Sequence, residues 1–401
     1  MNQPRNYIYH RFLSVLVAYL LCVFPVYAQD SGSVQTTAQQ LFITDFETGQ
    51  VLLEKNEISP MKPASMAKIM TIYIAFSRLA EGSLTLTDRF VVSEKAWKMG
   101  GSRSFLDAGS SVTLEELLNG IIVQSGNDAA VALAEGISGT EDNFVAEMNM
   151  VAQRLGMKDT NFTNSTGWPH PKLVTTARDL NILATALIKT FPADRYPELY
   201  PVFAKKSYTH NNIKQGNRNP LLYGKNASTN GVDGLKTGYT QESGYGLVAS
   251  ALRGSQRVIM VLNGMESKRQ RAQESRRLID FTFREFKLYE FFESGEIIDT
   301  ADVWLGAKPF VPLVIEAPLR RVMSRVQRAN TKVSLTWPNP VPAPITKGQE
   351  IGYLTIDIDG IPGDKISLIA GDDIPQLGTL DRLFEAMKFL IFGAPTNNTS
   401  S

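Results

Sequence analysis

The order of predicted strands and helices is the feature that most limits how this chain can fold. Two β-rich runs flank a Glu-Thr-Gly-Gln turn within residues 40–55, which predicts a hairpin. Further along, two β-rich runs at 244–252 and 257–264 predict an antiparallel strand pair, and a closing helix is predicted at 270–292. Strands that begin and end a region with helices between them predict an α/β (α+β) domain, here over residues 38–288. The helical patterns in between start near Ser65 and at 114–122, 129–136 and 176–191.

The residue composition and the predicted secondary structure change after Gly295. Proline becomes frequent, and short β-rich runs separated by turn signals dominate. The pattern predicts a small all-β sandwich over residues 295–378, and because it holds few candidate catalytic groups we interpret it as a spacer or docking module. The β-rich runs lie at 309–316, 332–337, 350–358 and 364–370.

Residues 379–393 predict an amphipathic helix. Such a helix either packs on its own domain or lies in a membrane interface. We favour an interfacial membrane anchor, because Phe389 and Phe392 widen the apolar surface and the helix follows a finished β-module. It is too short and too charged to span a bilayer. Its apolar side is formed by Leu380, Leu383, Phe384, Met387, Leu390 and Ile391, and its charged side by Asp381, Arg382, Glu385 and Lys388.

The N-terminus predicts a secretory signal peptide over residues 1–28. Arg5 and Arg11 precede an apolar run, and Val26 and Ala28 form the small-residue pattern of a cleavage site. An uncleaved membrane anchor is the alternative. The single cysteine, Cys22, lies inside this segment, so the mature chain would have no disulfide and no thiol nucleophile. An exported protein without disulfides is typical of a bacterial envelope.

Composition excludes several classes of function. The chain of 401 residues has a net charge of +1, which gives no argument for a nucleic-acid partner. Beyond the signal segment the only histidines are His170 and His210, so no metal site and no cofactor are predicted. A Ser-His-Asp hydrolase would need a Gly-x-Ser-x-Gly turn, and the sequence contains none.

The pattern Ser-x-x-Lys occurs twice within eleven residues. In the first copy, Ser59 and Lys62, the lysine precedes Pro63 and is pushed away from helical angles. In the second copy, Ser65 begins a largely apolar helix, and Lys68 follows one turn later on the same face. The dipole of that helix favours an alkoxide at its first turn. Taken by itself, this copy is better explained as a serine N-cap.

Two further motifs follow in order and strengthen the second copy. Ser125-Gly126-Asn127 leads into a predicted helix, and Lys236-Thr237-Gly238 enters a predicted strand. Ser-x-x-Lys, Ser-x-Asn and Lys-Thr-Gly in this order are the signature of penicilloyl-serine transferases. Another Ser-x-Asn at 228–230 leads into no helix and is set aside.

The blocks around these motifs resemble the D-alanyl-D-alanine carboxypeptidases, the low-molecular-mass penicillin-binding proteins. They read PASMAKIMT, SGNDAAVALAE, FTNSTGW and VDGLKTGYT. The resemblance covers essentially the whole mature chain, including the β-module and the terminal helix. It implies a catalytic domain of the β-lactamase/transpeptidase type. It also implies release of the terminal D-alanine from peptidoglycan stem peptides at the periplasmic face of the inner membrane, acylation by β-lactams, and a role in cell shape.

The chemistry of these residue types suggests a role for each. Ser65 would be the nucleophile that forms an acyl-enzyme, and Lys68 the general base, its pKa lowered by burial and by the charge of Lys236. Ser125 can relay a proton to the leaving amine. Asn127 can hold both Lys68 and the substrate backbone.

The substrate-binding residues follow from the strand and from the resemblance. Lys236 and Thr237 line a strand edge to which a peptide can add, and Gly238 leaves room for its approach. The resemblance places the oxyanion hole at the backbone N–H groups of Ser65 and Tyr239, where many relatives have histidine in place of Tyr239. It assigns the substrate carboxylate to Arg271 and Arg218.

Three alternatives stay open at this stage. A class A β-lactamase shares the motifs, but the stretch TTARDLNIL, with Asp179, lacks a clear Glu-x-x-Leu-Asn. A DD-endopeptidase of the same fold is closer in chemistry and usually lacks the β-module and tail. A non-catalytic envelope scaffold would have no reason to keep all of the motif residues.

Overall fold

The computed structural model describes residues 35–224, 231–359 and 361–392. The predicted signal peptide with Cys22, the Ser-x-Asn at 228–230 and residue 393 lie outside the described residues.

A five-stranded antiparallel sheet organises the first region. Its strand order is β2-β1-β9-β8-β7, so β7 is an edge strand. The predicted hairpin at its start and the predicted strand pair β8–β9 are confirmed. The strands are β1 (Gln40–Asp45), β2 (Val51–Lys55), β7 (Val232–Thr240), β8 (Gly244–Arg253) and β9 (Gln256–Met265).

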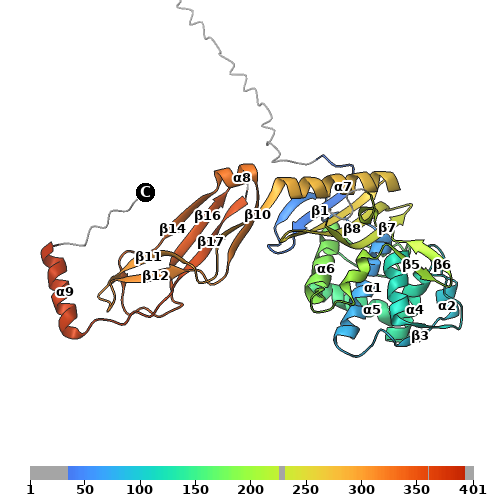
Figure 1. Ribbon diagram of the computed structural model, residues 1–401, viewed down its shortest axis with the longest axis horizontal. Coiled ribbons are helices and arrows are strands. Elements are labelled where there is room, and N and C mark those ends of the chain that lie inside the picture. Colours follow the sequence, from blue (N-terminus) through green and yellow to red (C-terminus); the bar gives the residue numbers. More distant parts are fainter. Residues whose placement is uncertain (1–34, 225–230, 360, 393–401) are drawn as a thin grey trace, which may run out of the picture. The chain divides into compact units, whose positions relative to one another are not determined.

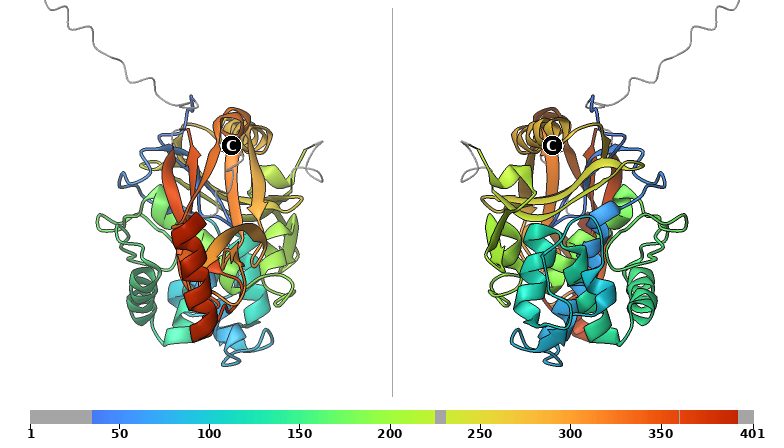
Figure 2. Two further views of the ribbon diagram at one scale, coloured as in Figure 1. Left: turned by 90° about the vertical axis from the view of Figure 1, so that its left-hand side faces the viewer. Right: turned by 90° about the vertical axis from the view of Figure 1, so that its right-hand side faces the viewer.

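Helices cover both faces of this sheet (Figures 1 and 2). Helix α7 packs against β8 and β9 on one face, and α6 packs against β1 and β9 on the other, next to α1 and α5. The expected α/β architecture is therefore confirmed. The helices are α1 (Lys68–Ala80), α2 (Glu94–Trp97), α3 (Leu114–Asn119), α4 (Asn127–Ser138), α5 (Glu141–Leu155), α6 (Ala177–Thr190) and α7 (Lys268–Glu285). Two small two-stranded sheets pair β3 (Arg89–Val91) with β4 (Ser111–Thr113) and β5 (Ser207–His210) with β6 (Ile213–Gly216).

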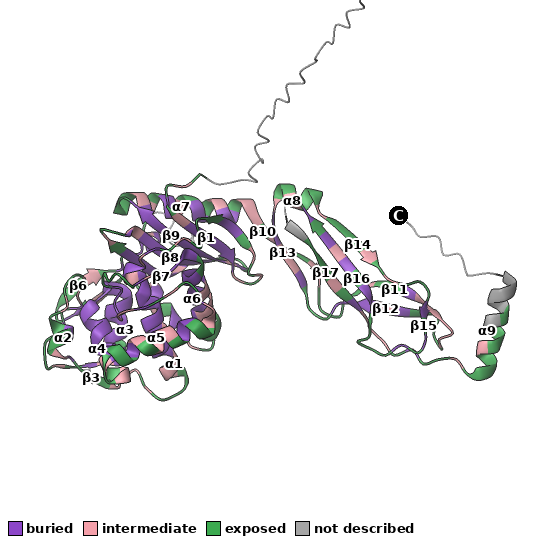
Figure 3. Cartoon of the chain, turned by 180° about the vertical axis from the view of Figure 1, so that it is seen from behind, coloured by how far each residue is buried: buried purple, intermediate pink, exposed green. Residues whose placement is uncertain are grey.

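The core is formed mainly by helices α1, α3, α4, α5 and α6, together with sheet residues that pack on them (Figure 3). Ile69, Ile72 and Phe76 of α1 are fully buried, as their helical spacing predicts. Phe76 meets Phe191 edge to face at 5.6 Å between ring centroids. The helix that begins at Lys68, directly after the turn with Ser65, is thus fixed in the core of this region.

Helix α5 was not predicted from the sequence. Its residues Phe144, Met148 and Val151 are buried at helical spacing, but charged and polar residues lie between them and apolar Met150 is exposed, which blurs the pattern. The clear local signal is its N-cap, where the Thr140 hydroxyl accepts a hydrogen bond from the N–H of Asn143 at 3.2 Å.

The predicted closing helix is too long. Helix α7 ends at Glu285, and β10 (Phe286–Phe292) follows, paired with β13 (Leu319–Ser324). The residues Phe-Lys-Leu-Tyr-Glu-Phe-Phe are mostly aromatic and have high strand propensity, and pairing with β13 overrides the helical continuation.

The β-rich region contains a six-stranded sheet of order β14-β16-β17-β12-β11-β15. Its core includes Val311, Leu313, Leu354 and Leu368, all fully buried. The predicted β-runs match β12, β14, β16 and β17, whereas β11, β13 and α8 were missed. The elements are β11 (Ile297–Trp304), β12 (Phe310–Val314), α8 (Arg325–Asn330), β14 (Lys332–Thr336), β15 (Val341–Pro342), β16 (Glu350–Ile358) and β17 (Ile361–Ala370).

Helix α9 (Thr379–Phe392) is the last described element. Leu380 is 83% exposed and Leu383 is 63% exposed. Among the described residues, no helix has both the length and the apolar character that crossing a membrane requires.

Candidate active site

Ser65 lies in a 3₁₀ turn, Ala64–Ala67, that runs directly into α1. The turn has no side-chain cap, so Ser65 is not the N-cap that the motif alone would allow. The residue before it, Ala64, has a positive φ of 48°, a backbone conformation that alanine rarely adopts. This bend sets the serine at the junction of the turn and the helix.

Lys68 is fully buried and its amine has three oxygen neighbours. It lies 3.0 Å from Ser65 Oγ, 2.7 Å from Asn127 Oδ1 and 2.6 Å from the Thr166 carbonyl oxygen. The Asn127 and Thr166 oxygens can only accept hydrogen bonds. A neutral amine has two N–H groups and one lone pair, so these two acceptors take both N–H groups. The lone pair then faces the Ser65 hydroxyl.

The surroundings of Lys68 favour its neutral form. Burial lowers its pKa from 10.5 to about 7, Arg218 adds to the lowering, and Asp128 opposes it. We expected Lys236 to supply the repelling charge, whereas Arg218 is the cation that contributes here.

Lys236 and Ser125 form a second buried pair. The Lys236 amine donates to Ser125 Oγ at 2.9 Å and to the Thr237 carbonyl at 3.3 Å. Ser125 follows a π-helical turn and has a left-handed φ of 61°, which turns its side chain back from the start of α4. Burial, with the charges of Lys68 and Arg218 among others, holds the pKa of Lys236 well below its usual value.

Asn127 is oriented by the loop in front of α4. Its Nδ2 donates to the Gly100 carbonyl at 2.7 Å, which directs Oδ1 toward Lys68. Asp128, which the sequence reading did not single out, accepts hydrogen bonds from the backbone N–H groups of Ser104 and Leu106 at 2.8 and 3.2 Å. The carboxylate of Asp128 therefore holds this loop against the first turn of α4.

The edge strand β7 passes close to the turn that carries Ser65. A Cβ on Gly238 would lie 2.8 Å from the Pro63 carbonyl oxygen and 3.2 Å from the Ala64 Cβ, so only glycine permits the approach. Tyr239 is 53% exposed, and its ring stacks on Tyr245 with 4.1 Å between centroids.

Both predicted arginines lie near this strand. Arg271 is 6% exposed and donates to the carbonyls of Gly246 and Arg218, each at 3.3 Å. Its Nε has no partner among the described residues. Arg218 is exposed and donates to Ser102 Oγ.

Lys62 of the first Ser-x-x-Lys has a different role from Lys68. Its amine donates to the carbonyls of His170, Pro171 and Leu173 at 3.3, 2.9 and 3.0 Å. Lys62 therefore stabilises the loop at residues 170–173 and forms no pair with Ser59.

Two family models match the sequence. One, described as D-alanyl-D-alanine carboxypeptidase, covers residues 27–267, and the other, described as the C-terminal domain of penicillin-binding protein 5, covers residues 286–376. The chain belongs to the D-alanyl-D-alanine carboxypeptidase family. The resemblance inferred from the motifs is thereby confirmed.

Relatives in this family match almost the full chain. D-alanyl-D-alanine carboxypeptidase DacA of Haemophilus influenzae is 35% identical, covering 95% of this chain and 97% of its own. DacC of Escherichia coli is 36% identical and covers 88% of each chain. The crystal structure of penicillin-binding protein 5 from Haemophilus influenzae has a TM-score of 0.73 at 35% identity, covering 86% of this chain and 99% of that one.

The structure brings together most of the residues predicted for the carboxypeptidase site. Lys68 links Ser65 to Asn127, and Lys236 contacts Ser125 two residues before Asn127. The sequence reading missed the Thr166 carbonyl, because a main-chain oxygen has no residue-type signature. Its only signal was the block FTNSTGW, which resembles the family without indicating which atom matters.

Proposed function

We propose that the chain is a serine D-alanyl-D-alanine carboxypeptidase of peptidoglycan metabolism that acts through an acyl-enzyme on Ser65. The activity is that of its family. The observation that supports the nucleophile is the fully buried amine of Lys68, with a pKa of about 7, 3.0 Å from the Ser65 hydroxyl.

The first step is attack on the carbonyl between the two D-alanines. The lone pair of Lys68 takes the Ser65 proton as Oγ bonds to the carbonyl carbon. The resulting oxyanion would accept hydrogen bonds from the backbone N–H groups of Ser65 and Tyr239. The C–N bond then breaks: Ser125, with Lys236 beside it, passes its proton to the departing amine and is reprotonated by the Lys68 ammonium, so that the proton taken from Ser65 ends on the leaving group. Water hydrolyses the ester and restores Ser65.

The substrate would bind as an extra strand along β7. Thr237 and Gly238 present the edge of the sheet, and Asn127 can also reach the peptide backbone. The free carboxylate of the terminal D-alanine would pair with Arg271, whose present contacts are to carbonyl oxygens, and with Arg218 beside it.

The same nucleophile would react with β-lactams. Penicillin-binding protein D2 from Listeria monocytogenes, 27% identical with a TM-score of 0.56, has a crystal structure in a cefotaxime-bound form. A strained β-lactam carbonyl would take the place of the D-alanyl carbonyl, and its amine leaving group would stay tethered to the acyl-enzyme.

The test is the intact mass of the purified protein over time with benzylpenicillin, for wild type, Ser65→Ala and Ser59→Ala. A lasting adduct lost only in Ser65→Ala supports the proposal. Rapid consumption of the drug without a lasting adduct would indicate a β-lactamase. If no adduct forms and the drug stays intact, the result would indicate a non-catalytic envelope scaffold. A DD-endopeptidase would form the adduct but cleave cross-linked dimers rather than release D-alanine.

We further propose two domains, at 38–288 and 295–378, and a place for the protein at the periplasmic face of the inner membrane. The exposed apolar residues Leu380, Leu383 and Met387 of α9 support an interfacial anchor over 379–393. Deleting this segment is expected to abolish co-sedimentation with lipid vesicles and to leave D-alanine release unchanged. Equal sedimentation of both forms would contradict the anchor.

A further inference from the structure

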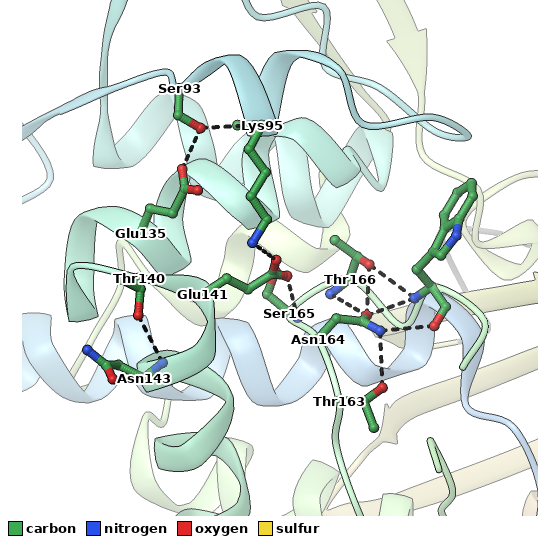
Figure 4. Close-up of polar contacts among 12 residues, drawn as sticks. Ser93, Lys95, Glu135, Thr140, Glu141, Asn143, Thr163, Asn164, Ser165 and Thr166 are labelled. Atoms are coloured by element: carbon green, nitrogen blue, oxygen red, sulfur yellow. Dashed lines mark hydrogen bonds and ion pairs between the residues drawn. The ribbon is translucent and has the colours of Figure 1, made fainter. Parts of the chain in front are cut away.

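A buried carboxylate outside the three sequence motifs holds the loop that contacts Lys68. Glu141, the first residue of α5, accepts hydrogen bonds from the Ser165 N–H at 3.0 Å and from the Ser165 hydroxyl at 2.7 Å (Figure 4). Its other oxygen lies 2.8 Å from the amine of Lys95. Burial alone would raise the pKa of Glu141, but Lys95 and Ser165 outweigh burial and lower it. Glu141 is therefore a charged, fully engaged carboxylate.

Ser165, which Glu141 holds, is followed directly by Thr166, whose carbonyl contacts Lys68. The Ser165 carbonyl accepts a hydrogen bond at 2.7 Å from the hydroxyl of Thr71, which lies one turn after Lys68 on α1. The next carbonyl, that of Thr166, accepts from the Lys68 amine at 2.6 Å. Ser165 is thus held by α5 at its N–H and by α1 at its carbonyl, and Thr166 reaches Lys68 from a doubly fixed peptide.

The side chain of Asn164 sets the remaining shape of the loop. Its Oδ1 accepts from the Thr166 N–H and hydroxyl at 3.2 and 2.9 Å and from the Trp168 N–H at 2.9 Å (Figure 4). These bonds give the loop its internal turn, whereas Glu141 supplies an external charged anchor.

We propose that Glu141, braced by Lys95, is a positioning residue for the carboxypeptidase reaction: through Ser165 it fixes the Thr166 carbonyl on the amine of Lys68. This inference rests on the proposed function of Lys68 as the base. When the neutral Lys68 amine donates one N–H to Asn127 and the other to the Thr166 carbonyl, its lone pair points at Ser65. If the Thr166 carbonyl moves, one N–H loses its acceptor and the lone pair is no longer directed.

The pH dependence of acylation can distinguish this role from a general structural one. The charged groups around Lys68 are Asp128 on α4, Arg218 in the loop before β7 and Lys236 on β7. Glu141→Gln changes none of them. A carbonyl acceptor stabilises the ammonium form of Lys68, so its loss lowers the pKa of that amine. Water entering a loosened site would instead raise the pKa toward that of a solvated lysine.

The experiment measures the second-order rate constant for acylation by a fluorescent penicillin from pH 5.5 to 9.5. For Glu141→Gln we expect the plateau to fall on the order of 10- to 100-fold and the midpoint of the rising limb to move to lower pH. Glu135→Gln is the matched control. Glu135 lies on α4 and accepts from the Ser93 hydroxyl at 2.6 Å, so this variant removes a nearby carboxylate without touching Ser165. Its effect should be much smaller than that of Glu141→Gln, because Glu135 acts on Lys95 only through its charge and makes no contact with the loop at Ser165.

Two further variants keep the proposal testable if Glu141→Gln folds poorly. Lys95→Met changes a half-exposed side chain and leaves the bonds to Ser165, so we expect a smaller loss in the same direction. Ser165→Ala combined with Glu141→Gln should cost no more than the worse single variant, because both act through one route.

Three outcomes would overturn the inference: a wild-type profile in Glu141→Gln, a midpoint that moves to higher pH, or additive losses in the double variant. Failure of the proposed function gives a different result. In that case wild type and Ser65→Ala would be labelled alike, whatever Glu141 does.

Discussion

The amine of Lys68 lies 3.0 Å from the hydroxyl of Ser65 and has no exposure to solvent. An ordinary lysine at this position would be charged at neutral pH and could not accept the serine proton. Burial, with a contribution from Arg218, brings the pKa to about 7 and makes the pair reactive. In the mechanism that we propose, the buried position of one amine is what would turn a common sequence pattern into a nucleophile with its base.

Acylation of the wild-type enzyme should therefore rise with pH through a midpoint near 7. The folded-state pKa of Lys68 is depressed, so its neutral, reactive fraction is about one tenth at pH 6 and about nine tenths at pH 8. Stopped-flow labelling with a fluorescent penicillin would measure this rise of the acylation rate with pH. A rate that keeps rising tenfold per pH unit up to pH 9 would mean that Lys68 titrates as an ordinary lysine.

Ser125→Ala should separate the peptide reaction from the reaction with β-lactams. Ser125 lies 2.9 Å from the amine of Lys236 and is placed to pass a proton to the leaving amine. We expect release of D-alanine to fall on the order of 10²- to 10⁴-fold. Acylation by penicillin should fall less, because its leaving amine cannot diffuse away. Equal losses in both assays would argue against the proton relay.

Arg271→Gln should weaken recognition of the substrate carboxylate. Burial lowers the pKa of this guanidinium to about 10, which still leaves it charged at neutral pH. Loss of a charge-assisted pair should lower kcat/KM for a peptide ending in free D-alanine by about 10- to 100-fold. The matched substrate is the same peptide with an amidated C-terminus, for which the variant and wild type should be similar. A loss that is equal for both peptides would assign Arg271 a structural role.

Much of this architecture could be predicted from local patterns. The order of the elements, the buried face of α1 and the pairing of β8 with β9 all leave periodic signals in the sequence. The boundary at Glu285 could not be predicted, because β10 exists through its pairing with β13, far along the chain. Helix α5 was missed because its apolar residues are not confined to one face: Met150 is exposed, and charged and polar residues lie between the buried ones.

The candidate site also contains groups that could be predicted from the sequence and groups that could not. Ser65, Lys68, Ser125 and Lys236 could be predicted because their side chains can carry the chemistry and fall in three motifs whose order is a known signature. The Thr166 carbonyl could not, since every residue has one and only the loop path brings this one to Lys68. Asp128 and Glu141 act on backbone N–H groups of loops distant in sequence, so their importance depends on tertiary structure.

Gly238→Ala tests the close contact between β7 and the turn that carries Ser65. An added Cβ would lie 2.8 Å from the Pro63 carbonyl, so the strand and the turn must move apart. We expect a stability loss of about 1–3 kcal/mol in chemical denaturation and a larger proportional loss in acylation, because the shift falls between Ser65 and the N–H of Tyr239. Gly216→Ala is the control: it lies in the β5–β6 hairpin, where an added Cβ is 3.3 Å from the terminal hydroxyl of Tyr223. A Gly238→Ala protein that acylates at the wild-type rate would show that the site does not depend on this approach of β7.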